Sequence, residues 1–264
     1  MDLYIKVIFL ACVQGVTEFL PVSSSGNLAV FENLLGIHSE SALTLTIVLH
    51  AGTLLAIIIF YLKTIIWVLK KKNWIVIFYI ILGSIPAGIV GIALKKSGAA
   101  DLFFSNLIVP GIGLLITGSF LMFIFKKRET GKTLKEITPI NAIIIGIFQA
   151  IAIVPGISRS GSTISSATMQ KIEQKEAATF SFLLAIPAIG GAAFLELISC
   201  LKKGNPSPEA ISSQILLVGF IISAIVGYFS LILLIKSLKK GTLRPYSYYC
   251  FCLGAFALLK GIFF

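Results

Sequence analysis

Six stretches of this 264-residue chain are apolar, almost free of charge and long enough to cross a lipid bilayer as helices. Only 12% of all residues are charged, against about 25% in an average soluble domain. We therefore predict an all-α polytopic membrane protein that forms one integral membrane domain over residues 1–264. The predicted spans are Ala42–Leu62, Trp74–Leu94, Leu102–Phe125, Ala177–Leu197, Ile215–Ile235 and Tyr246–Phe264.

Two further apolar segments, Leu3–Leu35 and Ile140–Ser166, are each interrupted in the middle by Pro, Gly and Ser. Non-helical backbone at membrane depth is tolerated only where protein buries it or a wet cavity faces it. Each segment is therefore predicted to form a re-entrant helical hairpin that enters and leaves on the same face. The tips of the two hairpins are expected to meet inside the bundle.

Positive charges gather after the first, third and fifth predicted spans, and fewer follow the second and fourth. The positive-inside rule then places the charge-rich loops, for example Lys71 and Lys127, in the cytoplasm and the C-terminus outside. A net charge of +11 would suggest nucleic acid as the partner of a soluble protein. Here the charges fit topology and anionic headgroups, so membrane lipids and no nucleic acid are expected.

The two halves of the chain resemble each other. Gln14 and Gln149 have the same separation as Ser25-Gly26 and Ser160-Gly161, and three predicted spans follow each pair. The charge pattern inserts the first half from outside and the second from inside, which is typical of an inverted-topology repeat. We predict repeat 1 over about 1–128 and repeat 2 over about 136–264. Ligand sites in such architectures lie near broken helices at the repeat interface.

The second interrupted segment contains PGISRSGST, in which Arg159 is the one charge between Ile140 and Gln170. Pro155 and Gly156 stop a helix, and Ser158 or Ser160 can cap the next one. Free N–H groups at a helix N-terminus together with a guanidinium bind phosphate-like anions. Because an arginine at membrane depth is costly without a partner, this motif predicts a functional site.

The first interrupted segment reads QGVTEFLPVSSSGN, in which Gln14 and Glu18 share one helix face. Glu18 is the only carboxylate between Asp2 and Glu32, so it and Arg159 are candidate partners. A buried ion pair that merely joins the hairpins is the alternative. The hydroxyl groups bunched at both turns favour a binding site, because hydroxyls that bond membrane helices together are usually scattered along their faces.

Three motifs of the chain carry a resemblance to a known protein family. TEFLPVSSSGN, PGISRSGSTIS and FSFLLAIPAIGGA together resemble the undecaprenyl-pyrophosphate phosphatase family, also called the bacitracin-resistance protein family, over essentially the whole chain. The resemblance implies two inverted repeats with re-entrant hairpins in the bacterial inner (plasma) membrane. It also implies removal of one phosphate from a C55 isoprenyl diphosphate on the extracytoplasmic side, which recycles the carrier lipid for peptidoglycan synthesis in cell wall biogenesis.

The chain departs from the family's pattern at one important position. Asn27 stands where the family usually has a His with a catalytic role, and an amide cannot shuttle a proton near neutral pH. Gln14 in place of Glu leaves one carboxylate fewer for a cation. The chain's histidines are His38, in a predicted loop, and His50, inside the first span; an ordinary structural role is expected for both.

The resemblance and the residues together give the candidate site. Glu18, Ser24 and Arg159 are the predicted catalytic residues. Ser24 is the best nucleophile candidate, with Ser25 next to it, and Arg159 binds the diphosphate. Glu18, weakly helped by Gln14, is either a ligand for Mg²⁺ or Ca²⁺ or a general base, and both roles stay open. The predicted substrate-binding residues are Gln14, Ser23, Ser25, Gly26, Asn27, Ser158, Ser160, Gly161 and Thr163.

The main alternative is a lipid carrier or flippase that binds the same headgroup without hydrolysis, since inverted repeats suit alternating access. A purely structural membrane subunit would leave the polar tips unexplained. The expected partners are the isoprenyl diphosphate and membrane lipids, and a homodimer is left open. The four cysteines show no metal or redox spacing and are interpreted as small apolar fillers.

Overall fold

The computed structural model describes residues 2–37, 39–70, 73–98, 103, 106–124, 130–203 and 211–263. Within these ranges every regular element is a helix, and pairing between extended segments is limited to one bridge joining Lys132 and Ile172. Among the described helices, four are long and apolar enough to cross a membrane. The prediction of an all-α polytopic membrane protein is confirmed.

The first interrupted segment forms α1 (Leu3–Phe19) and α2 (Ser24–Leu35), joined by a tight turn. Leu20 is extended, as expected for the residue before a proline, so α1 cannot continue through Pro21. The Ser23 hydroxyl accepts a hydrogen bond from the Gly26 N–H at 3.3 Å and thereby caps α2. Local sequence alone therefore explains the break.

The second interrupted segment forms α8 (Pro139–Ile151) and α9 (Arg159–Met169). Thr138 caps α8, and Pro139 occupies its first turn, where a missing N–H costs nothing. Ser158 caps α9, since its hydroxyl accepts from the Gly161 N–H at 3.1 Å. Of the two serines predicted as caps, Ser158 is the one used, and Arg159 becomes the first residue of α9.

Longer helices surround these hairpins. They are α3 (Ser39–Phe60), α5 (Trp74–Ser97), α10 (Gln174–Lys203), α11 (Ser213–Lys240) and α12 (Arg244–Phe263). At Tyr61 the chain bends by 70° into α4 (Leu62–Leu69), and α3 with α4 would count as a fifth span. Lys63, the residue after the first predicted span, lies in α4, and Val68 on this helix packs with Val76 and Leu183.

The predicted span Leu102–Phe125 corresponds to a shorter described helix. α7 (Ile108–Ser119) continues into the π-helical turn Phe120–Ile124, while part of the predicted span lies outside the described residues. The segment before α8 contains the 3₁₀ turn Leu134–Glu136. The number of six spans therefore stays a prediction.

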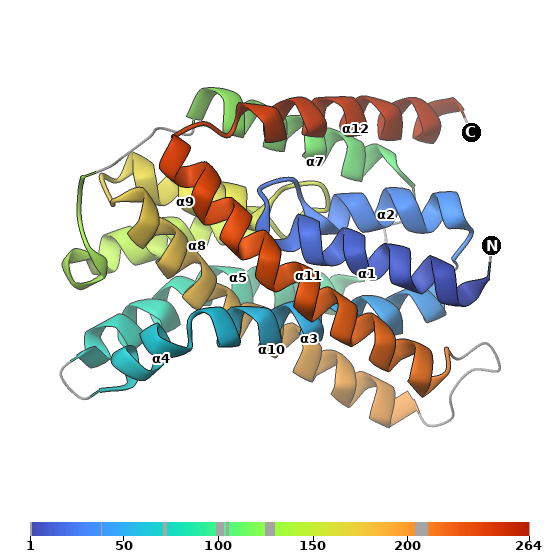
Figure 1. Cartoon of the computed structure of the whole chain (residues 1–264), viewed down its shortest axis with the longest axis horizontal. Helices are drawn as coiled ribbons and strands as arrows, with labels where there is room; N and C mark the ends of the chain where they lie inside the picture. Colours follow the sequence, from blue (N-terminus) through green and yellow to red (C-terminus); the bar gives the residue numbers. More distant parts are fainter. Residues whose placement is uncertain are drawn as a thin grey trace.

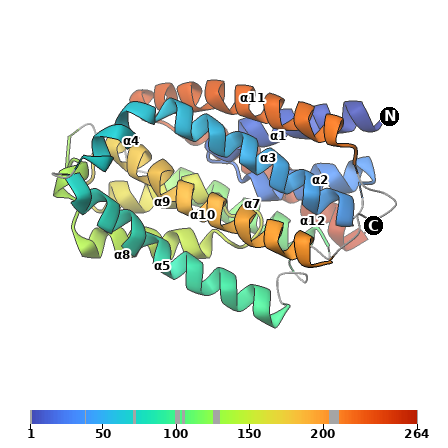
Figure 2. The ribbon, with the colours of Figure 1, turned by 90° about the horizontal axis from the view of Figure 1, so that it is seen from below.

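Helix contacts are paired between the two halves. α1 packs on α11 as α8 packs on α5, and α3 packs on α11 as α10 packs on α5. α7 and α12 lie side by side (Figure 1), and α10 lies between α3 and α5 (Figure 2). Two related halves would produce this pattern. Their boundaries and their opposite orientation in the membrane stay predictions.

The most polar helix is also among the most buried. α9 has the sequence RSGSTISSATM, and nine of its eleven residues are buried. Its hydroxyls bond mainly to backbone carbonyls one turn earlier, for example Ser166 to Thr163 O at 3.0 Å. Burying a hydroxyl group without a hydrogen bond is costly, and these bonds offset that cost for most of the helix; Ser165 Oγ, which has no partner among the described residues, is an exception. α9 thus places Arg159 at the centre of the bundle.

Candidate functional site

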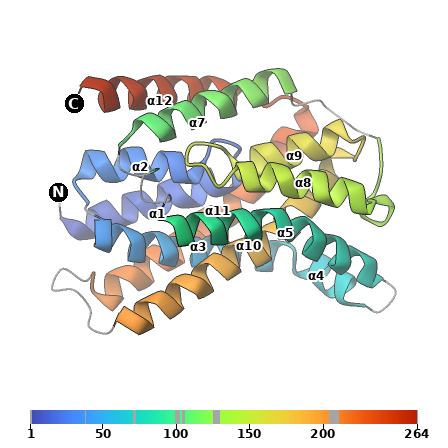
Figure 3. The ribbon, with the colours of Figure 1, turned by 180° about the vertical axis from the view of Figure 1, so that it is seen from behind.

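The two hairpin turns touch each other in the middle of the molecule. A Cβ added to Gly26 would lie 2.8 Å from Gly156 Cα, so the backbones are in direct contact. Gly156 itself has φ +89°, and a Cβ there would lie 2.1 Å from Pro110 O. Figure 3 shows the turn between α8 and α9 beside the α1–α2 hairpin. The predicted meeting of the tips is confirmed.

Glu18 and Arg159 form an ion pair at this contact. Arg159 Nη2 donates to Glu18 Oε1 at 2.5 Å, and the two side chains are only 15% and 5% exposed for Arg159 and Glu18. The other carboxylate oxygen accepts from Ser24 Oγ at 2.6 Å and from Gln14 Nε2 at 3.1 Å. The structure therefore brings Gln14, Glu18, Ser24 and Arg159 together, as the sequence predicted.

Several buried polar side-chain atoms of the two hairpins lack a partner among the described residues. Arg159 Nη1 and Gln14 Oε1 make no hydrogen bond, although both side chains contact Glu18 through their other atoms. Gln149 is also buried with both amide atoms unpaired. A buried guanidinium N–H without an acceptor is costly, and an anionic ligand at this point would supply that acceptor.

His50, which the sequence analysis expected to be structural, lies at the site. Its Nε2 is 3.5 Å from Glu18 Oε2, the oxygen that also accepts from Ser24. Its Nδ1 is 2.8 Å from the Thr46 carbonyl oxygen one turn earlier in α3. A carbonyl only accepts, so Nδ1 carries the hydrogen and Nε2 of the neutral ring has a lone pair. The signal that could have revealed it was an ionisable residue within a predicted span.

Other predicted hydroxyl groups are used within the turns. The hydroxyls of Ser23 and Ser158 cap the helices, and lie 3.3 Å from Ser25 Oγ and 3.2 Å from Ser160 Oγ respectively. Gly26 and Gly161 are two of the predicted substrate-binding residues. Their N–H groups donate hydrogen bonds to the hydroxyl oxygens of Ser23 and Ser158.

Thr163 is directed into the protein. Its hydroxyl donates to the Arg159 carbonyl at 2.8 Å and lies 2.5 Å from Ser181 Oγ on α10. The substrate-binding roles of this residue and of the turn hydroxyls stay predictions.

Asn27 is fully buried and engaged at every amide group. Its Nδ2 donates to Val22 O at 2.9 Å and to Ser23 O at 2.8 Å, and Tyr249 OH donates to its Oδ1. No amide hydrogen is left for a phosphate oxygen. The predicted substrate contact of Asn27 would have to use Oδ1, which is an acceptor and repels an anion.

The donors for the predicted cation are few. In the part of the chain that the structure describes, no group of three or more His, Cys, Asp or Glu could hold a metal. Glu18 supplies a carboxylate, and Gln14 Oε1 is a buried oxygen without a partner. Mg²⁺ is often held by one or two carboxylates plus substrate phosphates. These two residues therefore fit a hard cation only when a diphosphate supplies further oxygens.

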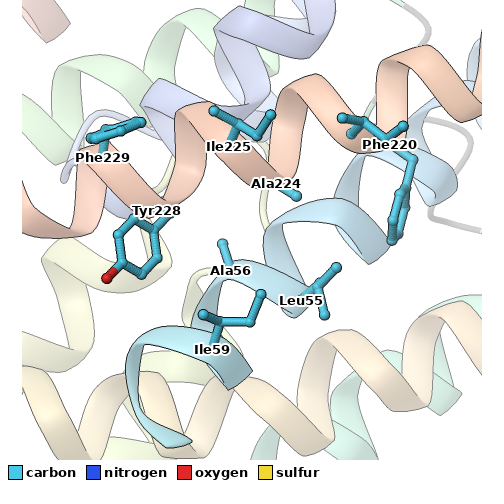
Figure 4. Close-up of a pocket in the computed structure, with 9 residues that line it drawn as sticks. Leu55, Ala56, Ile59, Phe220, Ala224, Ile225, Tyr228 and Phe229 are labelled. Carbon is cyan, nitrogen blue, oxygen red and sulfur yellow. The ribbon is translucent and has the colours of Figure 1, made fainter.

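An apolar groove of about 400 Å³ lies between α3 and α11 (Figure 4). Its walls carry no charged side chain, and the one polar atom shown among the sticks is the Tyr228 hydroxyl. The lining residues are Leu55, Ala56, Ile59, Phe220, Ile221, Ala224, Ile225, Tyr228 and Phe229.

Known proteins match this chain over its full length. The family model described as bacitracin resistance protein BacA matches residues 7–256. An undecaprenyl-diphosphatase of Halothermothrix orenii is 42% identical over 262 residues, covering 98% of both chains. Undecaprenyl-diphosphatase 4 of Bacillus cereus is 38% identical, covering 97% of this chain and 96% of the relative. The undecaprenyl-diphosphatase of Alkaliphilus metalliredigens is 37% identical over 96% of this chain.

The matches include both hairpins, and these hairpins hold the ion pair, the serine and the unpaired guanidinium nitrogen. On the full-length match and the identities above, the chain belongs to the bacitracin resistance protein BacA family.

Proposed function

We propose that this protein is a membrane phosphatase that hydrolyses an isoprenyl diphosphate, undecaprenyl diphosphate by the names of its relatives, to the monophosphate. One observation carries the proposal. The buried Arg159 guanidinium pairs with Glu18 through Nη2 and leaves Nη1 unpaired, while Ser24 bonds the same carboxylate. An anion-binding group, a nucleophile and a base are thus assembled at one point.

Substrate binding is assigned to Arg159 and the start of α9. The unpaired Nη1 offers a charge-assisted hydrogen bond to a phosphate oxygen, and the first turn of α9 adds its positive dipole end. In phosphoryl transfer the protein mainly positions the groups and neutralises charge on the equatorial oxygens. A single arginine at the transferring phosphate performs both tasks.

Ser24 is the proposed nucleophile. Its hydroxyl donates to Glu18 Oε2 at 2.6 Å, so the carboxylate is placed to accept the proton as Oγ attacks the terminal phosphorus. The bond from that phosphorus to the bridging oxygen breaks, and the isoprenyl monophosphate leaves. Water then attacks the phosphoserine, inorganic phosphate leaves, and the proton returns to Ser24 Oγ.

His50 is proposed to take over the proton that Glu18 accepts from Ser24 and to give it back through Glu18 when the phosphoserine is hydrolysed. Its Nε2 lone pair lies beside the oxygen to which Ser24 donates, and Thr46 fixes the ring. The imidazole thus comes from α3, whereas the family usually has its histidine at the position of Asn27.

The cation is part of the proposal. Glu18 and the unpaired Gln14 Oε1 are the residues that would hold Mg²⁺ or Ca²⁺ together with the diphosphate. When bound, such an ion would neutralise charge on the phosphate oxygens. The chain's own residues supply the nucleophile, the base and the guanidinium.

We further propose the bacterial inner membrane as the location, with the site open toward the extracytoplasmic side and the product recycled into peptidoglycan synthesis. The charge-rich segments support this orientation through the positive-inside rule. The isoprenyl tail would lie in an apolar groove open to lipid, and the groove between α3 and α11 has suitable chemistry. A carrier would have no use for a serine bonded to a carboxylate, so hydrolysis is favoured over transport.

Phosphate release from C55 diphosphate by the purified protein with Mg²⁺ tests the proposal. Arg159→Ala, Glu18→Ala and Ser24→Ala are each expected to lower kcat by about 10² to 10³-fold, as loss of one stabilising group does in other enzymes. Arg244→Ala and Asp2→Ala, both exposed, are the matched charge controls. Binding of undecaprenyl phosphate without any phosphate release by the wild type would overturn the phosphatase in favour of the carrier.

His50 is tested in the same assay. His50→Gln is expected to lower kcat by about 10², while Thr53→Val on the same helix serves as a control that bonds only backbone carbonyls. Unchanged kcat in His50→Gln would remove the residue from the mechanism and leave Glu18 as the sole base.

A further inference from the structure

The turn that carries Ser24 is held from outside its own hairpin. Tyr249 on α12 donates its hydroxyl hydrogen to Asn27 Oδ1, and the neighbouring Cys250 thiol lies 4.0 Å from the Pro21 carbonyl oxygen. Both contacts join the last helix of the chain to a turn near its beginning. The position of that turn is therefore decided by α12 as well as by α1 and α2.

Asn27 transmits this contact to the turn. Its two amide hydrogens reach back to the carbonyl oxygens of Val22 and Ser23 at 2.9 and 2.8 Å, and its own N–H donates to Ser23 O at 3.1 Å. Two donors on one short side chain are needed for this arrangement, and asparagine provides them. Tyr249 orients the amide by bonding its oxygen.

The turn needs such support. Ser23 has φ +63°, a conformation that residues with a side chain rarely adopt. The residue after it is Ser24, whose hydroxyl must reach Glu18 Oε2 at 2.6 Å. If Ser23 relaxed to an extended or helical conformation, the direction of the chain at Ser24 would change and the contact would be lost.

The second turn is held in a corresponding way by α7. The Thr117 hydroxyl donates to Gly156 O at 2.8 Å and accepts from the Ser158 N–H at 2.9 Å. Gly156 there has positive φ, as Ser23 has in the first turn. Because α7 and α12 pack on each other, one helix pair fixes both turns.

From these contacts we infer that Asn27 and Tyr249 are positioning residues that set the orientation of Ser24 for phosphoryl transfer, rather than groups that bind the phosphate. The inference rests on the proposed phosphatase activity. It would also account for an asparagine at position 27, where the family resemblance leads us to expect a histidine. Because His50 already provides an imidazole, residue 27 need not be a histidine and can instead stabilise the turn.

Tyr249→Phe in the purified full chain is the primary test, with Tyr248→Phe as its matched control. Tyr248 is adjacent, exposed on the same helix, and makes no side-chain hydrogen bond in the described part of the chain. Tyr249→Phe is expected to lower kcat about 10- to 100-fold, the loss typical of a displaced reactive group. KM should stay within about twofold, since Arg159 still binds the diphosphate.

Asn27→His gives an independent arm. Two ring nitrogens pointing in different directions cannot donate to both Val22 O and Ser23 O, so kcat is expected to fall as in Tyr249→Phe, again without a change in KM. Thermal unfolding of each variant shows whether it is folded, and Tyr249→Phe, which loses one oxygen atom, remains informative if Asn27→His does not fold.

Three results decide between the possibilities. The inference would be overturned if Tyr249→Phe left both kcat and KM unchanged, if it raised KM alone, or if Asn27→His were faster than the wild type. Each of these results would leave the phosphatase proposal intact. Absence of phosphate release by the wild type would instead refute the proposed function, and the inference with it.

Discussion

Removing the Arg159 guanidinium while keeping its apolar volume separates structural from catalytic roles of the ion pair. In Arg159→Met the Glu18 carboxylate, 5% exposed, loses its 2.5 Å partner and keeps only neutral donors and His50. Breaking a buried pair by removal of one charge costs about 3–5 kcal/mol. Ser24 and Gln14 still donate hydrogen bonds to this carboxylate and offset part of the loss, so the lower half of that range is expected.

The double variant Glu18→Gln/Arg159→Met removes both charges together. Replacement of a whole buried pair by neutral groups of similar size is often neutral for stability. We therefore expect Arg159→Met to lower the apparent melting temperature by roughly 6–16 °C, and the double variant to recover most of that loss. Thermal unfolding in detergent, followed by tryptophan fluorescence, measures both, with the exposed Arg244→Met as control.

Phosphate release is measured on the same samples. It is expected to be lost in the single and the double variant alike, because the double variant restores stability without restoring the guanidinium. A stable double variant that still releases phosphate at the wild-type rate would show that the pair only joins the hairpins. Equal stability of Arg159→Met and wild type would refute the buried-charge reasoning itself.

Three further predictions concern other parts of the chain. Gly156→Ala should prevent folding or lower the melting temperature strongly, because φ is +89° and the new Cβ would lie 2.1 Å from a backbone oxygen, whereas Gly88→Ala in α5 meets no atom within 4 Å and should be tolerated. The Thr133 backbone N–H, and then its hydroxyl, hold the pKa of the exposed Glu136 carboxyl below its ordinary value. The stabilisation of the folded protein by these hydrogen bonds is present above the ordinary pKa of a glutamate and is lost as pH falls through the lowered pKa of Glu136. Thr133→Pro removes both donors and should raise the pKa of Glu136 in an NMR titration. A cysteine in place of Lys71, a position outside the described residues, should react with impermeant reagents from the cytoplasmic side only. Labelling from outside would contradict the predicted topology.

The helical elements follow largely from local sequence. Long apolar stretches form helices because the backbone must satisfy its own hydrogen bonds in lipid. Pro21 stops α1, and Ser158 starts α9 by capping it, as proline geometry and hydroxyl capping predict. The scarcity of other buried charges made Glu18 and Arg159 each other's expected partner, and the structure pairs them.

Tertiary packing decided what local sequence could not. The bend at Tyr61 depends on how α4 packs against α5, and the histidine of the site comes from α3, because helix packing alone brings His50 Nε2 within 3.5 Å of Glu18. The role of Asn27 is set by Tyr249, more than 200 residues away along the chain. Sequence thus determined which segments are helical and where they break, since those depend on neighbouring residues; only the folded bundle determined which side chains meet, since those contacts join residues far apart.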